Sequence, residues 1–118
     1  MILEIRTYRL VPGTRPEFLR LMREESGPLL AAAGIRVVDA GAPLVDEGDW
    51  EEAFLIRAFG SLADRDRLEE SFYGGDAWRG PGEDGPSLRD RVMACIESYH
   101  TVVLDVPESV VDGLTPPS

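Results

Sequence analysis

The sequence contains only one cysteine and one histidine in 118 residues. With Cys95 alone, no intramolecular disulfide can form, and a lone thiol among apolar residues is typical of a small core side chain. A zinc site would have to take most of its ligands from carboxylates, which zinc rarely does. The sequence also lacks a nucleotide-binding glycine motif, a phosphate-binding loop and a nucleophile elbow. We therefore expect neither a metal nor a cofactor.

Long apolar runs are missing as well, and none approaches the roughly 18 residues that a membrane-spanning helix needs. Met1 to Leu10 has no basic region followed by an apolar run, so we expect a cytoplasmic protein. The formal net charge of −10 excludes nucleic acid and anionic membrane surfaces as partners, because their phosphates would be repelled. The length is enough for one hydrophobic core and too short for two.

The first third of the chain predicts a strand, a helix and a second strand. Strand-forming residues fill Met1 to Val11, and Pro12-Gly13 ends the run. Thr14 and Glu17 are spaced as a capping box, so we expect a helix from there to the Ala31–Ala33 run, ended by Gly34. Residues 35–40 form the second predicted strand.

The remainder predicts a turn-rich segment at 41–49, a strand at 50–59 and a helix capped by Ser61 and Asp64. Residues 74–86 form an irregular, glycine-rich connection. An apolar stripe with helical spacing then runs from Leu88 to Tyr99, followed by a last strand at 100–106. This order is the split β-α-β motif of an α+β, ferredoxin-like fold with an antiparallel sheet. We expect one domain over residues 1–106 and a loosely held tail over 107–118.

The last two predicted strands indicate self-association. Within Ala53 to Phe59 only Arg57 is polar, and the strand from Thr101 to Val106 is nearly as apolar. A sheet covered by helices on one side would alternate apolar and polar residues, so both faces of this sheet must be buried. A homodimer is the commonest solution. The alternative is that the tail or the 41–49 segment folds back over the open face.

Several stretches resemble the NIPSNAP family. The opening residues 1–13 are similar to the family's acidic-hydrophobic-Arg-x-Tyr strand followed by Pro-Gly. The stretch Ser61-Leu62-Ala63-Asp64-Arg65 resembles its "Ser-Leu-x-Asp-Arg" helix, and Asp76-Ala77-Trp78 the acidic-x-Trp that follows. The resemblance covers most of residues 1–106 and implies a dimeric α+β barrel in which two sheets face each other. The wider barrel group includes cofactor-free monooxygenases, isomerases, cyclases and haem enzymes, so the fold does not choose a chemistry.

The candidate catalytic residues are His100, Tyr8 and Arg6. Glu4, Arg6 and Tyr8 share one face of the first strand by its two-residue period. Arg6 either forms a structural pair with Glu4 or holds an anionic or enolate oxygen, with Tyr8 donating a hydrogen bond. His100 is the natural general acid–base group because its pKa ordinarily lies near neutrality. A structural role for His100 and ligation of haem iron are its alternatives.

The candidate substrate-binding residues are Arg57, Trp50, Tyr73 and Trp78. The three aromatic side chains can line a pocket for a flat apolar ligand, or else pack the helices onto the sheet. Arg57 interrupts an apolar strand and is grouped with Arg6 as a pocket residue.

Two hypotheses of function follow. One is a cofactor-independent enzyme of secondary metabolism, of monooxygenase, isomerase or cyclase type, acting on a small and largely apolar metabolite. The other is a non-catalytic ligand-binding or scaffold protein.

Overall fold

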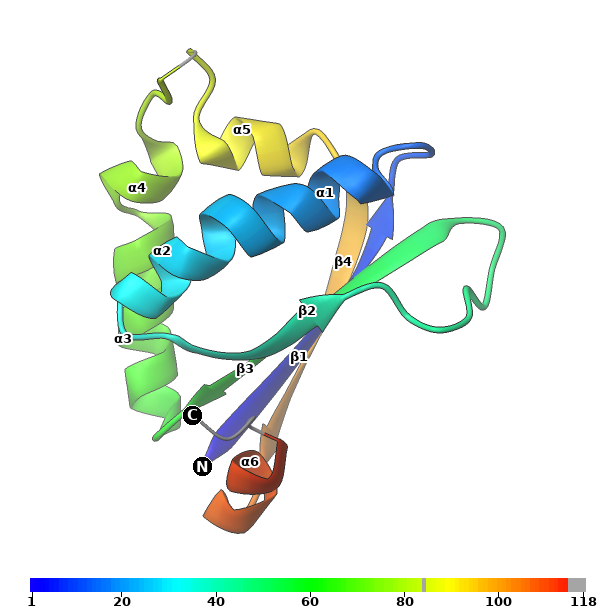
Figure 1. Ribbon diagram of the computed structural model, residues 1–118. Coiled ribbons are helices and arrows are strands. Elements are labelled where there is room, and N and C mark those ends of the chain that lie inside the picture. The colour runs from blue at the N-terminus through cyan, green and yellow to red at the C-terminus, as the bar shows by residue number, and fades with distance from the viewer. Residues whose placement is uncertain (84, 115–118) are drawn as a thin grey trace.

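The computed structural model describes residues 1–83 and 85–114. Four strands form one antiparallel sheet in the order β2-β3-β1-β4: β1 (Ile2–Leu10), β2 (Arg36–Gly41), β3 (Glu51–Phe59) and β4 (Ile96–Asp105). One face carries α1 (Arg15–Leu21), the π-helical turn η1 (Met22–Ser26), α2 (Gly27–Ala32), α3 (Leu62–Tyr73), α4 (Asp76–Arg79) and α5 (Leu88–Met93) (Figure 1). The predicted ferredoxin-like fold is confirmed.

The core lies between the sheet and these helices. Leu10, Phe18, Leu21, Leu30 and Leu55 are almost completely buried there. Each fully buried aliphatic or aromatic side chain contributes about 1.5–3 kcal/mol. These residues come from β1, α1, α2 and β3, so the core holds the first helical segment across the middle of the sheet.

The first predicted helix is nearly continuous but contains a wider turn. Pro28 lies in the first turn of α2 and has no N–H group to donate to a preceding carbonyl. Just before it, the Gly27 N–H bonds to the Met22 carbonyl five residues back, which is the π-helical pattern. The predicted Thr14 cap is wrong: the Thr14 hydroxyl donates instead to the carbonyls of Val11 and Cys95, at 2.6 and 3.1 Å. The Ser61 cap is confirmed, with Oγ accepting from the Asp64 N–H at 3.1 Å.

The apolar stripe from Leu88 to Tyr99 was expected to be one helix, and that expectation is wrong. Helix α5 ends at Met93, and β4 begins at Ile96 and pairs with β1 along nearly its whole length. Extended pairing satisfies the backbone of β1, which a longer helix would leave unpaired on that side. A bulge between the pairs at Arg9 and Leu10 accommodates the start of the strand.

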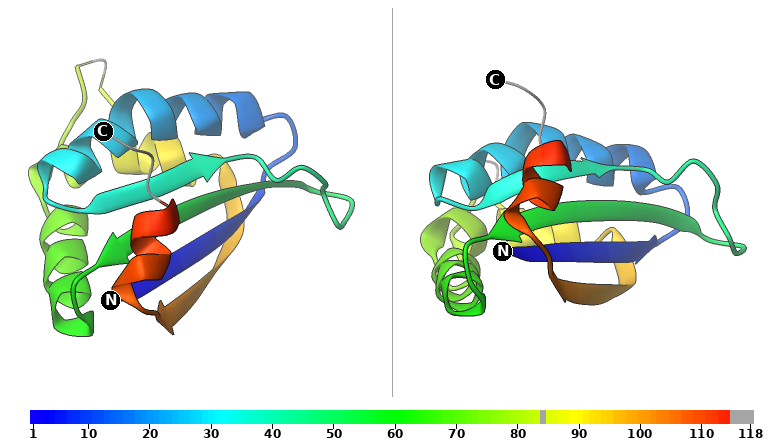
Figure 2. Two further views of the ribbon diagram at one scale, coloured as in Figure 1. Left: turned by 60° about the horizontal axis from the view of Figure 1, so that its bottom comes forward. Right: turned by 90° about the horizontal axis from the view of Figure 1, so that it is seen from below.

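The described part of the C-terminal segment forms a helix, α6 (Glu108–Leu114), whose Val111 is completely buried. The Val106 N–H bonds to the Met1 carbonyl at 2.9 Å, and Arg36 pairs with Asp112 at 3.6 Å. Figure 2 shows α6 across one end of the sheet, on the face opposite α1 and α5. Part of the expected tail thus folds back over the open face; residues 115–118 lie outside the described part.

Most of the open face is not covered by α6. Val102 and Leu104 are 40% and 39% exposed, and the neighbouring Ile5, Phe54 and Ile56 are only half-buried. Leu44, in the connection between β2 and β3, is 100% exposed, so that segment does not bury its apolar side chain here. None of the described helices is long and apolar enough to cross a membrane.

Candidate functional site

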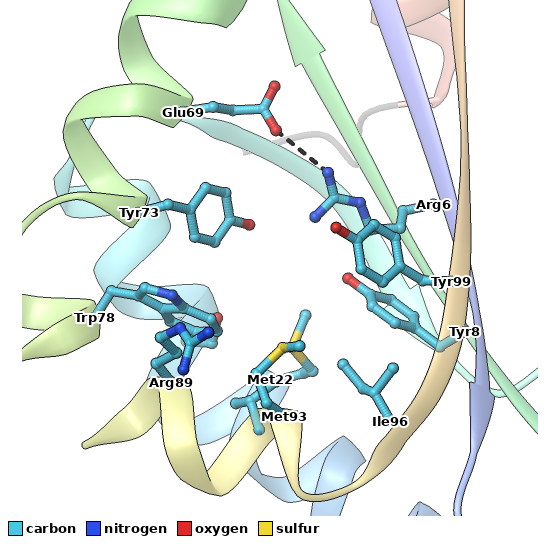
Figure 3. A pocket seen from close by; sticks show the side chains of 12 residues that line it. Arg6, Tyr8, Met22, Glu69, Tyr73, Trp78, Arg89, Met93, Ile96 and Tyr99 are labelled. Atoms are coloured by element: carbon cyan, nitrogen blue, oxygen red, sulfur yellow. Dashed lines mark ion pairs between the residues drawn. The ribbon is translucent and has the colours of Figure 1, made fainter.

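A cavity of about 320 Å³ lies between the helix-covered face of the sheet and the helices η1, α3, α4 and α5 (Figure 3). Polar side chains line one part of it: Arg6, Tyr8, Glu69, Tyr73 and Tyr99. Apolar side chains line the other: Met22, Trp78, Val92, Met93 and Ile96; Ser26 and Arg89 complete the lining.

Strand alternation brings Arg6 and Tyr8 to the cavity. Arg6 lies opposite Thr101, and Tyr8 lies opposite Tyr99, on the neighbouring strand β4. The Arg6 Nε donates to the Thr101 hydroxyl at 3.0 Å, and the guanidinium lies 4.9 Å from the centre of the Tyr99 ring. These contacts hold the Arg6 side chain along the sheet with its terminal nitrogens toward the cavity.

Tyr8 is buried, with its ring 4.8 Å from that of Phe18 and 6.2 Å from that of Tyr99. Burial raises the pKa of the Tyr8 hydroxyl, and the nearby positive charge of Arg6 offsets only part of this increase. Tyr8 therefore remains a neutral phenol at physiological pH. A neutral phenol can donate a hydrogen bond to an anionic oxygen, and it is a poor proton acceptor.

The aromatic wall of the cavity comes from the end of α3 and from α4. The rings of Tyr73 and Trp78 meet edge to face at 5.2 Å, and Phe72 lies 5.1 and 5.9 Å from them. Gly74 and Gly75 separate the two helices, and a Cβ at either would come within 2.9 Å of a backbone oxygen. The glycines thus allow the tight turn that brings Trp78 back onto Tyr73.

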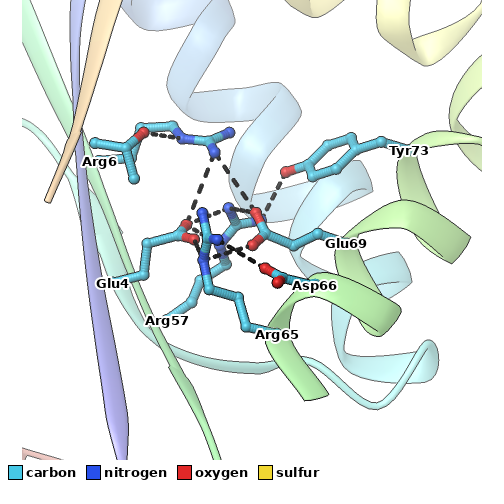
Figure 4. A network of polar contacts seen from close by, with 8 residues as sticks. Glu4, Arg6, Arg57, Arg65, Asp66, Glu69 and Tyr73 are labelled. Atoms are coloured by element: carbon cyan, nitrogen blue, oxygen red, sulfur yellow. Dashed lines mark hydrogen bonds and ion pairs between the residues drawn. The ribbon is translucent and has the colours of Figure 1, made fainter. Parts of the chain in front are cut away.

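A buried network of arginines and glutamates lies next to the polar part of the cavity (Figure 4). Glu4 and Arg57 are both completely buried and hydrogen-bonded to each other. Arg57 also donates to Glu69 Oε1 at 2.7 Å and to the Tyr73 hydroxyl at 2.6 Å. Arg65 donates to Glu4 at 2.6 Å and pairs with Glu69 at 2.9 Å. The network joins β1, β3 and α3.

The two carboxylates of this network differ. Burial opposes ionisation of Glu4, but the positive charges and hydrogen bonds of Arg57 and Arg65 outweigh it and hold its pKa below the ordinary value. Burial raises the pKa of Glu69, and the negative charge of nearby Glu4 adds to the increase. Glu69 is the one that lines the cavity. It is therefore the carboxylate better suited to accept a proton.

The structure brings four of the seven predicted site residues to this cavity: Arg6, Tyr8, Tyr73 and Trp78. Arg57 lies directly behind them, with its hydrogen bonds made to the network.

Trp50 and His100 line a separate groove of about 260 Å³ on the open face, together with Thr7 and Arg9. Arg9 stacks on Trp50 at 3.5 Å, and the Trp50 indole N–H donates to Glu52 at 2.9 Å. His100 is paired with Thr7, and Thr7 alternates on β1 with the cavity residues Arg6 and Tyr8. His100 and Arg6 therefore do not share a cavity.

Sequence reasoning missed Glu69, Arg65 and Tyr99. Arg65, Glu69 and Phe72 are spaced four and three residues apart, so they share the face of α3 that turns inward. That spacing is the signal that could have identified them. Tyr99 was missed because it was assigned to a helix. Among the described residues, no group of three or more His, Cys, Asp or Glu side chains is placed to hold a metal ion.

Comparison with solved structures supports the fold. A NIPSNAP domain protein from Burkholderia xenovorans is 21% identical, with 92% of this chain and 96% of that chain covered and a TM-score of 0.74. A candidate antibiotic biosynthesis monooxygenase from Nitrosomonas europaea is 16% identical, with 90% and 98% covered and a TM-score of 0.62. A dimeric ferredoxin-like protein from an uncultured marine organism is 14% identical, with 91% and 89% covered and a TM-score of 0.55.

Likenesses at these identities establish the fold and not the chemistry. No curated protein matches the sequence. The NIPSNAP family model, however, matches residues 3–83, which is more than half of the chain. That stretch includes β1, α3 and the Trp78 segment, the parts that form the polar side and the aromatic wall of the cavity. The chain therefore belongs to the NIPSNAP family.

Proposed function

We propose that the protein binds a small, largely apolar metabolite in the cavity between the sheet and its helices. The cavity itself carries this proposal. It has an apolar wall of Met22, Met93 and Trp78, with a few convergent polar groups at one end, which is the usual composition of a small-molecule site. Arg6 and Tyr8 hold an oxygen of the ligand, while Tyr73 and Trp78 contact its apolar body. Arg57 supports the site from behind through Glu69 and Tyr73.

We further propose that the protein is a homodimer, joined through the open face of the sheet. Ile5, Phe54, Ile56, Val102 and Leu104 are apolar side chains left partly exposed there. A second copy can bury them, and about 800 Å² from each partner would make an interface of ordinary size. The fold neighbour described as a dimeric ferredoxin-like protein supports this arrangement. The single cysteine suits the reducing cytoplasm, where we propose that the dimer works.

A second candidate function is cofactor-independent catalysis of secondary metabolism on the bound molecule. Two observations favour it: Glu69 lines the cavity with its pKa raised by burial, and one fold neighbour is a candidate antibiotic biosynthesis monooxygenase. In this scheme Glu69 accepts a proton from the ligand's carbon, forming a carboxyl O–H, and the electron pair remains on the ligand as an enolate. Arg6 and Tyr8 stabilise the enolate oxygen. His100, on the opposite face, takes no part.

Native mass spectrometry of the freshly purified protein tests the binding proposal. We expect a dimer that carries one extractable small molecule per subunit, and that loses it when Trp78→Asp places a charge in the apolar wall. A dimer that takes up no small molecule, even from a metabolite extract, would count against the cavity as a binding site.

Hydrogen–deuterium exchange of the extracted molecule in heavy water tests the catalytic proposal. We expect the protein to accelerate exchange at one carbon, Glu69→Gln to remove the acceleration, and His100→Ala to leave it unchanged. Binding without accelerated exchange would leave the protein a non-catalytic ligand-binding protein.

A further inference from the structure

We propose that the ligand is an organic monoanion, a flat apolar acid whose carboxylate binds at the polar end of the cavity through Arg6. This inference rests on the proposed function, because it requires the cavity to be a binding site. It goes further by assigning the chemical class of the ligand. The charge of the buried network, the long distances from Arg6 to the two carboxylates and the orientation of the Tyr73 hydroxyl carry it.

The charges beside the cavity do not balance. Three guanidiniums, those of Arg6, Arg57 and Arg65, share two carboxylates: that of Glu4, which is completely buried, and that of Glu69, which is 12% exposed. The sum is one positive charge. A further carboxylate, Asp66, pairs with Arg65 at 3.1 Å, but its side chain is 64% exposed and its charge is screened by water. This local excess of positive charge occurs in a chain whose net charge is −10.

The unbalanced charge is located on Arg6. Both carboxylates accept short hydrogen bonds from Arg57, whereas Arg6 reaches them only at 3.5 and 3.9 Å. The Arg6 Nε donates to the Thr101 hydroxyl, and Arg6 also interacts with the Tyr8 hydroxyl. A guanidinium that makes only long ion pairs with its carboxylates, is only 15% exposed and lies next to a cavity can bind a further carboxylate, because both its charge and its fork geometry match.

Tyr73 supplies a further donor at the same end. Its oxygen accepts a hydrogen bond from Arg57 Nη1 at 2.6 Å, so its own proton must point elsewhere. Figure 3 shows the Tyr73 hydroxyl directed into the cavity, toward the side where the Arg6 guanidinium and the Tyr99 hydroxyl lie. Accepting a bond from a charged donor polarises the hydroxyl and strengthens it as a donor. The polar end thus offers several hydrogen-bond donors to an anion.

The other end of the cavity requires an apolar body. Met22, Met93 and Ile96 face it from below in Figure 3, and Trp78 forms its side. Arg89 lies beside Trp78, but it is 42% exposed and already pairs with Asp90 at 3.5 Å. A dianion or a sugar acid would therefore place polar groups against the methionine and isoleucine side chains without partners, which is costly. One ring or two fused rings carrying a single carboxylate would place an anion at the polar end and an apolar body at the other end of this cavity of about 320 Å³.

The methionines make the test possible. The chain has three: Met22 and Met93 line the cavity and Met1 does not. Protein labelled with ¹³C at the methionine methyl groups is titrated with 2-naphthoate and, separately, with 2-naphthamide, its uncharged isostere. We expect both probes to shift the Met22 and Met93 signals but not that of Met1, and naphthoate to bind about tenfold more tightly or better, as one charge-assisted pair provides.

Two matched variants then locate the preference. Arg6→Met should bring the two affinities within about twofold of each other, while Arg6→Lys should keep part of the difference. Arg9→Met is the control, because Arg9 lies on the same strand but on the open face, stacked on Trp50. It should preserve the full preference for naphthoate. The unchanged Met1 signal and far-UV circular dichroism check that each variant is folded.

The outcomes separate the two proposals. Equal affinity for naphthoate and naphthamide, with shifts at Met22 and Met93, would overturn the monoanion while leaving the cavity a binding site. A preference that survives Arg6→Met would overturn the role of Arg6 and the charge argument with it. If neither probe shifts Met22 or Met93, the cavity is not a site for flat apolar molecules, and the proposed function fails together with this inference.

Discussion

The two faces of the sheet invert the usual distribution of polar and apolar side chains. The helix-covered face buries Glu4 and Arg57 completely, although ionised groups are rarely found in a protein interior. The open face leaves Val102 and Leu104 about two-fifths exposed, although apolar side chains are normally withdrawn from water. Both faces consist of alternating residues of the same four strands.

Each departure indicates a separate role. Buried charges are costly to desolvate, and here they lie next to the polar end of a cavity, so they are best explained by what the cavity binds. Exposed apolar residues are best explained by what covers them. The chain has twelve arginines and no lysine, which suits the buried network because a guanidinium can serve two carboxylates at once, as Arg57 does. We therefore expect that substitutions can disrupt the buried network on one face without affecting the dimer, and the dimer without affecting the network.

The largest effect on stability should come from Arg57→Met, which keeps the size of the side chain but removes its charge. Glu4 would remain buried with its main partner lost, which costs about 3–5 kcal/mol of unfolding free energy. Denaturant titration measures this loss. Arg20→Met is the control, because Arg20 pairs with Glu17 on the surface and should have no measurable effect. If the two variants lost equal unfolding free energy, the buried Arg57 would contribute no more to stability than the surface Arg20.

The open face can be tested with two neighbouring valines. Val102 lies on the open face and Val103 on the face of Glu4, and they are 40% and 39% exposed. Val102→Lys should raise the dimer dissociation constant about 100-fold or more, because it buries an unpaired charge in each half of the interface. Val103→Lys should leave the dimer intact. Analytical ultracentrifugation gives both constants, and a dimer unaffected by Val102→Lys would place the interface elsewhere.

A smaller loss is expected from Tyr73→Phe. The Arg57 Nη1 donor would lose its acceptor while remaining buried, at a cost of about 1–3 kcal/mol. The same variant should weaken binding of 2-naphthoate without changing the dimer. Chemical denaturation and the methionine-methyl titration measure the two effects. A loss of stability with unchanged naphthoate affinity would show that Tyr73 supports the network but does not contact the ligand.

The smallest effect concerns pH, because the two carboxylates act in opposite directions. The lowered pKa of Glu4 contributes stability above its ordinary value of 4.5 that is lost as the pH falls through the lowered pKa. The raised pKa of Glu69 means that the folded state takes up a proton first, so stability rises as the pH falls toward 4.5. Glu69→Gln should remove that rise. Urea midpoints measured from neutral to acidic pH would reveal this difference. Identical pH profiles for the wild-type protein and Glu69→Gln would contradict the raised pKa of Glu69.

The fold could be predicted from the sequence because its signals are local. The Ser61 cap and the Pro12-Gly13 stop delimit elements by the chemistry of neighbouring residues. The limits of β4 could not be predicted, because Ile96 and Tyr99 fit a helical stripe and only pairing with β1 makes them a strand. Helix α6 was missed for a similar reason, since Val111 is buried only against the rest of the fold.

The site was only partly predictable. The period of β1 put Arg6 and Tyr8 on one face, and the structure confirms that placement. His100 was selected for its chemistry alone, and its face depends on the register between β1 and β4, which the sequence does not contain. Glu69 looked like one charge among many on a polar helix, and its environment depends on Glu4 and Arg57 from other elements.

The central claim is that the cavity binds its ligand within one chain while the opposite face assembles the dimer. Native mass spectrometry of the Val102→Lys variant with 2-naphthoate tests it most directly. We predict a monomer that carries one naphthoate. A monomer that no longer binds naphthoate, when the wild-type dimer does, would contradict the claim by showing that the cavity depends on the partner.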